Sequence, residues 1–112
     1  MHLFLDGRDL EAPSIADIME FLTSAPGVVG MTAIQPPIVL KTPSGYAGYI
    51  LLAESHVSYH RHHEEVHIDC FSCKEFDDEV FEQFCERALN VTFVRRFVDV
   101  KRLDLENIGV RC

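Results

Sequence analysis

The sequence predicts an α+β domain, a two-layer sandwich in which two helices cover one face of a largely antiparallel sheet. Three observations lead to this prediction. The chain has 112 residues, the size of one domain, and neither a linker nor a repeat divides residues 1–112. Two segments carry apolar residues at helical spacing, and the segments around them have the composition of short strands. The expected order is one strand, a helix, four strands, a second helix and a last strand.

The first helix is marked at both ends. Ser14, followed by Asp17 three residues later, forms a capping box at its start, and Pro26-Gly27 closes it. The residues expected on its buried face are spaced three and four apart: Ile15, Ile18, Met19 and Leu22. A short apolar strand over residues 2–5 precedes this helix.

Extended segments fill the middle of the chain. Residues 29–41 are expected to be extended, with Pro36-Pro37 at an edge or bulge. After a turn at 43–45, strands are expected at 48–53, 56–60 and 66–71. In the middle one of these, Val57 and Tyr59 share one face, and the other face carries His56, Ser58 and His60.

The second helix is expected over residues 75–89, with acidic residues at its start and Asn90 at its end. Two apolar stripes run along it: Phe76, Val80, Phe84 and Ala88, and beside them Phe81, Cys85 and Leu89. A last strand is expected over 91–100 and a loosely held tail over 104–112. Because both helices are expected to pack on one face of the sheet, we expect a second subunit to cover the other face.

Composition limits the possible partners. The chain has 18 Asp and Glu against 10 Lys and Arg, a net charge of −8. This charge disfavours binding to nucleic acid and favours cationic partners. Pro36-Pro37 interrupts the longest uncharged stretch, so no membrane span is expected, and the first residues do not resemble a signal peptide. We therefore expect a cytoplasmic protein with reduced thiols, of which Cys70 and Cys85 lie in the core.

The polar residues gather between Glu54 and Cys73. Five of the six histidines lie within the twelve residues from His56 to His67. One interpretation is a zinc site, since Cys70 and Cys73 have the spacing of half of a zinc-binding motif. The candidate ligands are His60, His62, His63, His67, Cys70 and Cys73. A second interpretation is a histidine-rich turn between two strands, without chemistry.

The same segment resembles a known family. Glu54-Ser55-His56, followed by His60, Glu64 and the strand end Asp69-Cys70-Phe71-Ser72-Cys73, resembles the prokaryotic S-adenosylmethionine decarboxylase proenzymes. Upstream, residues 43–48 (Pro-Ser-Gly-Tyr-Ala-Gly) resemble that family's glycine-containing run before an apolar strand. The expected order of elements also agrees, so the resemblance covers most of the chain.

This resemblance implies a cofactor made from the chain itself. Ser55 would attack the Glu54 carbonyl, the peptide bond would become an ester, and cleavage between residues 54 and 55 would leave a pyruvoyl group derived from Ser55. The pyruvoyl ketone would form a Schiff base with the substrate amine and take up electrons as carbon dioxide leaves. The resemblance gives His60 the processing role, Cys73 the role of proton donor, and Glu64 a role in substrate binding.

The spacing between Ser55 and His60 limits how their two side chains could come together. In an extended chain, residues five apart point to opposite faces, so a bend or bulge at Ser55 is needed to bring the two side chains together. A strained turn between two strands would also hold the Glu54 carbonyl near attack distance.

Three positions depart from the family pattern. His62-His63 stand where the family has Trp-Pro, and Ile38 stands near the place of an aromatic residue that stacks on adenine. In residues 45–48, Ala47 stands where the family has a serine, whose hydroxyl is linked to processing. Tyr46 or Tyr59 could replace the missing ring. The chain thus keeps more of the expected machinery for making a pyruvoyl group than for holding adenosine.

The resemblance implies a pyruvoyl-dependent carboxy-lyase of polyamine (spermidine) biosynthesis that works as a homodimer. Its substrate would be a small cationic molecule with an α-amino acid group, first of all S-adenosylmethionine. Ornithine or arginine is the alternative substrate, with Glu64 or Glu65 pairing the distal cation. A binding or regulatory relative that does not process itself, and a His/Cys metal-binding module, are the other classes.

Overall fold

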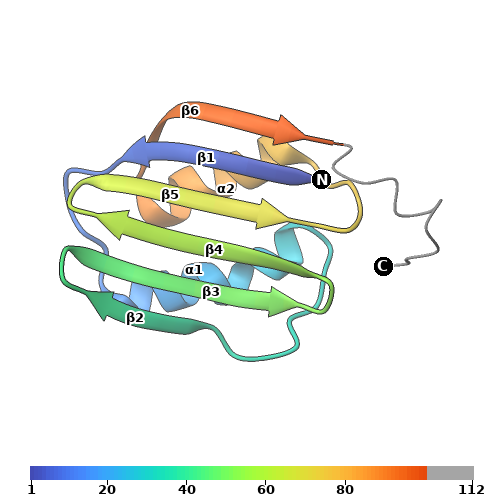
Figure 1. Ribbon diagram of the computed structural model, residues 1–112, viewed down its shortest axis with the longest axis horizontal. Coiled ribbons are helices and arrows are strands. Elements are labelled where there is room, and N and C mark those ends of the chain that lie inside the picture. Colours follow the sequence, from blue (N-terminus) through green and yellow to red (C-terminus); the bar gives the residue numbers. More distant parts are fainter. Residues whose placement is uncertain (101–112) are drawn as a thin grey trace.

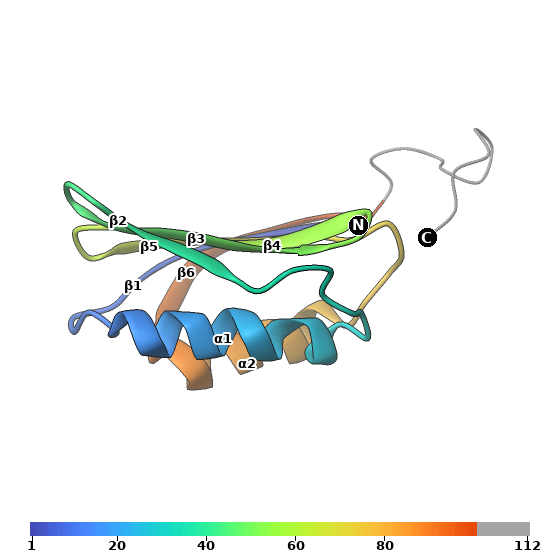
Figure 2. The ribbon, with the colours of Figure 1, turned by 90° about the horizontal axis from the view of Figure 1, so that it is seen from below.

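The structure is a computed structural model that describes residues 1–100, so the tail expected at 104–112 lies outside the described residues. Two helices and six strands form two layers (Figures 1 and 2). The elements are, in order, β1 (His2–Arg8), α1 (Ile15–Val28), β2 (Ile38–Thr42), β3 (Gly45–Leu52), β4 (Ser55–His62), β5 (Glu65–Phe71), α2 (Asp78–Leu89) and β6 (Thr92–Asp99).

The strands form one antiparallel sheet in the order β2-β3-β4-β5-β1-β6. The chain's first strand therefore lies inside the sheet, between β5 and β6. Both helices pack on the same face, as Figure 2 shows from the side. The predicted α+β two-layer sandwich is confirmed.

The predicted start of α1 and end of α2 are confirmed, but α1 continues through Pro26-Gly27 to Val28, and the predicted helix faces are only partly confirmed. The Ser14–Asp17 capping box is present, and Asn90 ends α2 in the left-handed conformation. On α1, Ile18 and Leu22 are buried as expected, but Ile15 and Met19 are 43% and 40% exposed. The other buried residues of α1 are Phe21, Ala25 and Pro26. The expectation for Ile15 and Met19 was wrong because spacing defines a stripe but not how far it turns toward the sheet.

The second helix differs from the prediction at its start and on one of its faces. It begins at Asp78, three residues later than expected, because the Asp77 side chain accepts a hydrogen bond from the Val80 N–H and caps the first turn. Of the two expected stripes, the one with Phe81, Cys85 and Leu89 is buried. Val80, in the other stripe, is 46% exposed.

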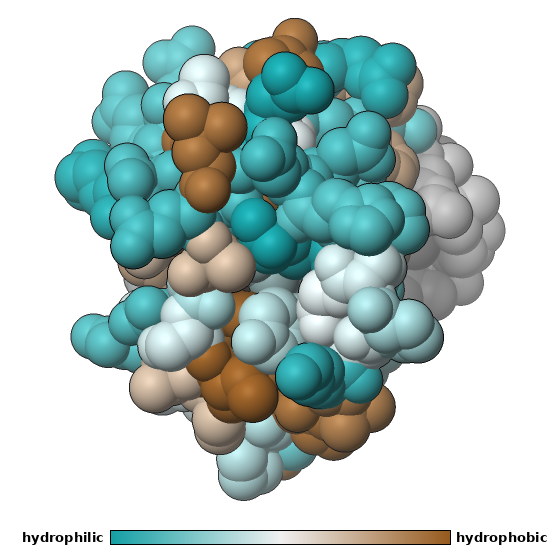
Figure 3. Space-filling model, turned by 90° about the vertical axis from the view of Figure 1, so that its left-hand side faces the viewer, coloured by the Kyte–Doolittle hydropathy of each residue, from teal (hydrophilic) through white to brown (hydrophobic). Residues whose placement is uncertain are grey.

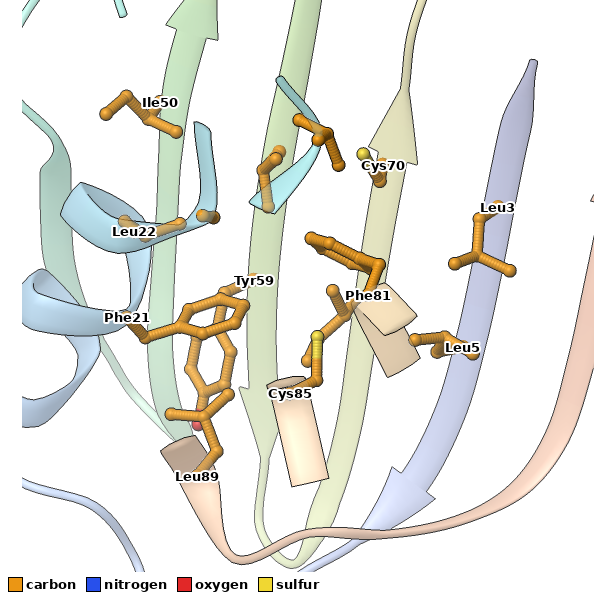
Figure 4. Packing of buried hydrophobic residues seen from close by; sticks show 14 of the residues in the cluster. Leu3, Leu5, Phe21, Leu22, Ile50, Tyr59, Cys70, Phe81, Cys85 and Leu89 are labelled. Carbon is orange, nitrogen blue, oxygen red and sulfur yellow. The ribbon is translucent and has the colours of Figure 1, made fainter. Parts of the chain in front are cut away.

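The core lies between the sheet and the helices. Figure 4 shows Tyr59 of β4 beside Phe21 of α1, with Phe81 and Cys85 of α2 nearby. Val57, Tyr59 and Cys70 are at most 1% exposed, so the predicted inward face of β4 and the core position of Cys70 are confirmed.

Two glycines of the run at residues 43–48 explain how β3 fits its neighbours. A Cβ on Gly45 would overlap the Arg61 carbonyl of β4. A Cβ on Gly48 would lie 3.0 Å from the Ile38 carbonyl oxygen and 3.1 Å from a methyl of Leu22 on α1. This run therefore allows close approach of strand to strand and of helix to sheet.

The second face of the sheet is covered by no other element of the described chain (Figure 2). We call it the outer face. Strand alternation places on it His2, Phe4 and Asp6 of β1, His67, Asp69 and Phe71 of β5, His56, Ser58 and His60 of β4, Tyr49 of β3, and Arg95 and Phe97 of β6. A second subunit on this face remains a prediction.

Candidate active site

The predicted cleavage site lies in a tight turn between two central strands. Leu52 of β3 pairs with Ser55 of β4, so Ala53 and Glu54 alone form the loop. Ala53 has a φ of 59°, which is unfavourable for an alanine because its Cβ crowds the backbone. Ala53 and Glu54 are exposed, whereas Ser55 is only 3% exposed. The Glu54–Ser55 bond therefore joins an exposed, strained turn to a buried residue.

Ser55 is held by Cys73. The Ser55 Oγ accepts a hydrogen bond from the Cys73 backbone N–H at 3.1 Å and lies 3.6 Å from the Cys73 Sγ. Cys73 follows β5 by one residue, Ser72, whose own N–H donates to the Met1 carbonyl at 2.8 Å. The start of β4 and the end of β5 therefore lie at the same end of the sheet, on the right in Figure 1. The structure thus brings together two of the residues that the resemblance singled out.

The cysteines differ in chemical state. Cys70 and Cys85 are free and buried, and burial raises the pKa of the Cys70 thiol to about 12 and that of Cys85 well above its usual value. The Cys73 sulfur, in contrast, is in a disulfide bond. The expectation of reduced thiols is therefore correct for Cys70 and Cys85 and wrong for Cys73 in this state. Cys112 lies outside the described residues.

His60 is not beside Ser55. The pairing of β4 with β3 and β5 runs without a break, so the bend or bulge that would bring the two together is absent. Ser55 points toward the helices, while His60 lies on the outer face, exposed and roughly 17 Å farther along the strand. Within one chain, the geometry expected for a processing histidine is therefore not formed.

Glu64 lies still farther away, in the turn between β4 and β5. His62 pairs with Glu65 across this turn. Glu64 therefore lies at the opposite end of β4, roughly 23 Å from Ser55. Figure 3 looks at this end of the molecule, where hydrophilic side chains cover most of the surface between separate apolar patches. Glu64 and Glu65 are exposed there, so neither reaches Ser55 of the same chain.

A buried ion pair anchors that far end of β4. Asp9 Oδ1 accepts from Arg61 Nε at 2.8 Å and contacts Nη2 at 2.6 Å. The Asp9 side chain is 2% exposed and that of Arg61 11%. The hydrogen bond to Asp9 raises the pKa of Arg61, which keeps the guanidinium charged.

Near Ser55, the outer face carries an aromatic cluster that the sequence reading missed. The rings of His2 and Phe4 stack with centroids 3.8 Å apart, and His56 stacks on Phe71 at 5.7 Å. His2 also makes edge contacts with His56 and Phe71. The signal was alternation in residues 2–5: since Leu3 and Leu5 are buried, His2 and Phe4 must face outward.

The aromatic residues proposed as replacements for the ring missing at Ile38 do not suit that role. Tyr59 is 1% exposed within the core, and Tyr46 packs against the same core. Ile38 lies on the edge strand β2 and is 37% exposed. The cluster of His2, Phe4, His56 and Phe71 lies on the outer face, whereas the Ser55 side chain points toward the helices.

The histidine-rich segment does not form a metal centre in the described residues. No group of three or more His, Cys, Asp or Glu side chains between residues 1 and 100 is arranged to hold a metal ion. His67 instead contacts Asp6 at 2.7 Å, and this hydrogen bond is the main cause of the lowered pKa of Asp6. Arg95 contacts the second Asp6 oxygen at 3.0 Å. The zinc interpretation gains no support.

Comparison with known proteins decides the family. A family model described as S-adenosylmethionine decarboxylase matches residues 1–102. The chain belongs to the S-adenosylmethionine decarboxylase family. The S-adenosylmethionine decarboxylase proenzyme of Symbiobacterium thermophilum is 31% identical over 77 residues, which cover 64% of this chain and 58% of that relative. The match therefore spans little more than half of the relative's length.

None of the helices within residues 1–100 is long and apolar enough to cross a membrane.

Proposed function

We propose that this chain is a self-processing, pyruvoyl-dependent decarboxylase of S-adenosylmethionine that serves polyamine biosynthesis. The observation that carries the proposal is the placement of Ser55. Its hydroxyl oxygen is buried, oriented by the Cys73 N–H, and next to the strained turn that contains the Glu54 carbonyl. A fixed hydroxyl next to a strained turn favours an acyl shift from nitrogen to oxygen.

The residues present fit a pyruvoyl group at position 55. Such a group supplies a conjugated carbonyl that accepts the electron pair released when carbon dioxide leaves. Cys73 lies close enough to act on what is bound there, since its Sγ is 3.6 Å from the Ser55 Oγ. In its reduced form, the Cys73 thiol would hold the proton that the substrate carbon takes up. The disulfide state of Cys73 would be inactive, so activity is expected only under reducing conditions.

The aromatic cluster favours S-adenosylmethionine over a simple basic amino acid. The rings of His2, Phe4, His56 and Phe71 gather on the outer face, at the end of the sheet where β4 begins with Ser55. Such rings stack on a nucleobase and attract a sulfonium through their π faces. Ornithine and arginine carry no ring, and the exposed Glu64 and Glu65 are too distant to pair their cationic ends within one chain.

We further propose a homodimer formed through the outer face. An uncovered sheet face with Phe97 59% and Tyr49 38% exposed leaves apolar surface in water. His60 lies on that face and does not reach Ser55 of its own chain, so a site between subunits would use His60 of the partner subunit. Glu64 of the partner subunit would contribute to the site in the same way, because Glu64 of the same chain does not reach Ser55.

Intact-mass analysis of the purified protein tests processing. We expect fragments 1–54 and 55–112, the second with a blocked N-terminus that borohydride or hydrazine modifies. Ser55→Ala should remain one chain, while Ser24→Ala, a change on the exposed surface of α1, should cleave normally. A parent chain that stays intact and carries no trappable carbonyl would refute the enzyme and favour a binding or regulatory relative.

Release of carbon dioxide in reducing buffer then decides the substrate. We expect release from carboxyl-labelled S-adenosylmethionine and none from ornithine or arginine. Phe4→Leu should raise KM for S-adenosylmethionine about tenfold, because one stacking ring contributes about 1–3 kcal/mol. Release from ornithine or arginine alone would assign the other substrate class.

The shared site has its own test. Ser55→Ala and His60→Ala chains, each inactive, are expressed together and separately. Recovery of activity in the mixture is expected if His60 of the partner subunit serves Ser55. Ultracentrifugation that finds only monomers in the active protein would contradict the shared site.

A further inference from the structure

Ala53 stands out among the residues around the cleavage site because nothing in its chemistry suits its backbone conformation. In residues 1–100, three residues other than glycine have positive φ: Ala53, His63 and Asn90. Asn90 ends a helix, where this conformation is common and asparagine tolerates it. Ala53 has a short apolar side chain that cannot compensate through a hydrogen bond.

The turn cannot relax while the chain is intact. Ala53 has positive φ and Glu54 does not, the sign pattern of a type II′ turn, in which glycine is the ordinary first residue. The strands that flank the loop, β3 and β4, pair with each other along their whole length, from Gly45 opposite His62 to Leu52 opposite Ser55. Beyond the turn, the Ser55 side chain is fixed by the Cys73 N–H. The peptide unit between Glu54 and Ser55 therefore lies between two anchored points.

We propose that Ala53 is a positioning residue for self-cleavage, and that relief of its backbone strain accelerates the first step. This inference rests on the proposed self-processing. In that step a bond forms between the Ser55 Oγ and the Glu54 carbonyl carbon, the bond from that carbon to the Ser55 nitrogen breaks, and the hydroxyl proton ends on the freed nitrogen. The path from Glu54 to the Ser55 Cα becomes one atom longer, so the loop widens and Ala53 leaves the left-handed region.

The chain contains a matched control. The turn between β4 and β5 also has two residues, His63 and Glu64, closed by the pair His62–Glu65. His63 has a φ of 56°, nearly that of Ala53. This second turn lies at the opposite end of β4, where no cleavage is proposed. Ala53→Gly and His63→Gly should relieve the same kind of backbone strain. Only Ala53→Gly should change the rate of cleavage.

The experiment follows cleavage of freshly translated chains over time on a gel, with hydroxylamine added to trap the ester. We expect Ala53→Gly to cleave about fivefold more slowly than the parent, the factor that corresponds to about 1 kcal/mol of lost strain. Ala53→Asn, which keeps a Cβ but tolerates positive φ, should fall between them. His63→Gly should cleave at the parental rate.

Stability measurements separate strain from a general effect on folding. In a Ser55→Ala background, Ala53→Gly and His63→Gly should both raise the denaturant midpoint, while only the first slows cleavage in the native sequence. Equal cleavage rates for parent, Ala53→Asn and Ala53→Gly would overturn the role of Ala53 and leave self-processing intact. A parent chain that never cleaves would overturn both.

Discussion

The Ser55 hydroxyl oxygen accepts a hydrogen bond from the backbone N–H of Cys73, 18 residues later in the chain. Because the donor is a backbone group, this orientation does not depend on the Cys73 side chain. The Cys73 sulfur, 3.6 Å from the same oxygen, is available for a separate task once it is a reduced thiol. The two functions of this residue can therefore be separated by substitution.

Cys73→Ala should still cleave at Ser55, because the alanine keeps the N–H that orients the hydroxyl. Decarboxylation in reducing buffer should fall by about 10²–10⁴-fold, the usual contribution of a positioned proton donor. Intact mass and carbon dioxide release measure the two effects on the same sample. Cys70→Ala is the matched control, since Cys70 is buried and faces the core. An active Cys73→Ala enzyme would exclude Cys73 as the donor.

Arg61→Met should lower the free energy of unfolding by about 3–5 kcal/mol, because it leaves the Asp9 carboxylate buried without its cation. Denaturant titration of the uncleaved Ser55→Ala chain measures this loss. Arg95→Met provides the comparison: Arg95 also pairs with an aspartate, Asp6, but its side chain is 78% exposed, so about 1 kcal/mol or less is expected. Equal losses in the two variants would mean that burial does not distinguish these pairs.

Tyr59→Phe should leave stability unchanged or raise it by up to about 1 kcal/mol. The Tyr59 hydroxyl is buried and has no hydrogen-bond partner among the described residues, and burial raises its pKa. Removing it therefore removes an unsatisfied group while the ring keeps its contact with Phe21. Thermal unfolding in the Ser55→Ala background measures the effect. A loss above about 1 kcal/mol would indicate that the hydroxyl binds a buried water.

Asp6→Asn should destabilise the protein by about 0.5–1 kcal/mol at neutral pH. The hydrogen bond from His67 lowers the pKa of Asp6 in the folded chain, so its carboxylate stabilises the fold above the ordinary value of 3.8. This contribution is lost as the pH falls through the lowered pKa. Urea titrations from pH 7 to pH 2 should therefore show the parent and variant converging at the acid end. Glu20→Gln, on the exposed surface of α1, should show no such convergence; a constant gap for Asp6→Asn would argue against an ionic role.

Much of the fold could be predicted because its signals are local. Ser14 with Asp17 marks the start of α1, and alternation in β4 separates Val57 and Tyr59 from His56, Ser58 and His60. Helix faces were less predictable. Ile15 and Met19 match the helical period but stay exposed, because the sheet decides which side of the stripe it covers.

The sequence alone determined the order of the elements, the two faces of β4 and the family motif around Ser55. Only the tertiary structure decided that Cys73 meets Ser55, that His60 does not, and that His2, Phe4, His56 and Phe71 form one ring cluster. The reason is physical. Alternation and capping arise from the sterics of neighbouring residues, whereas contacts between β1, β4 and the end of β5 depend on strand order and register across the whole sheet.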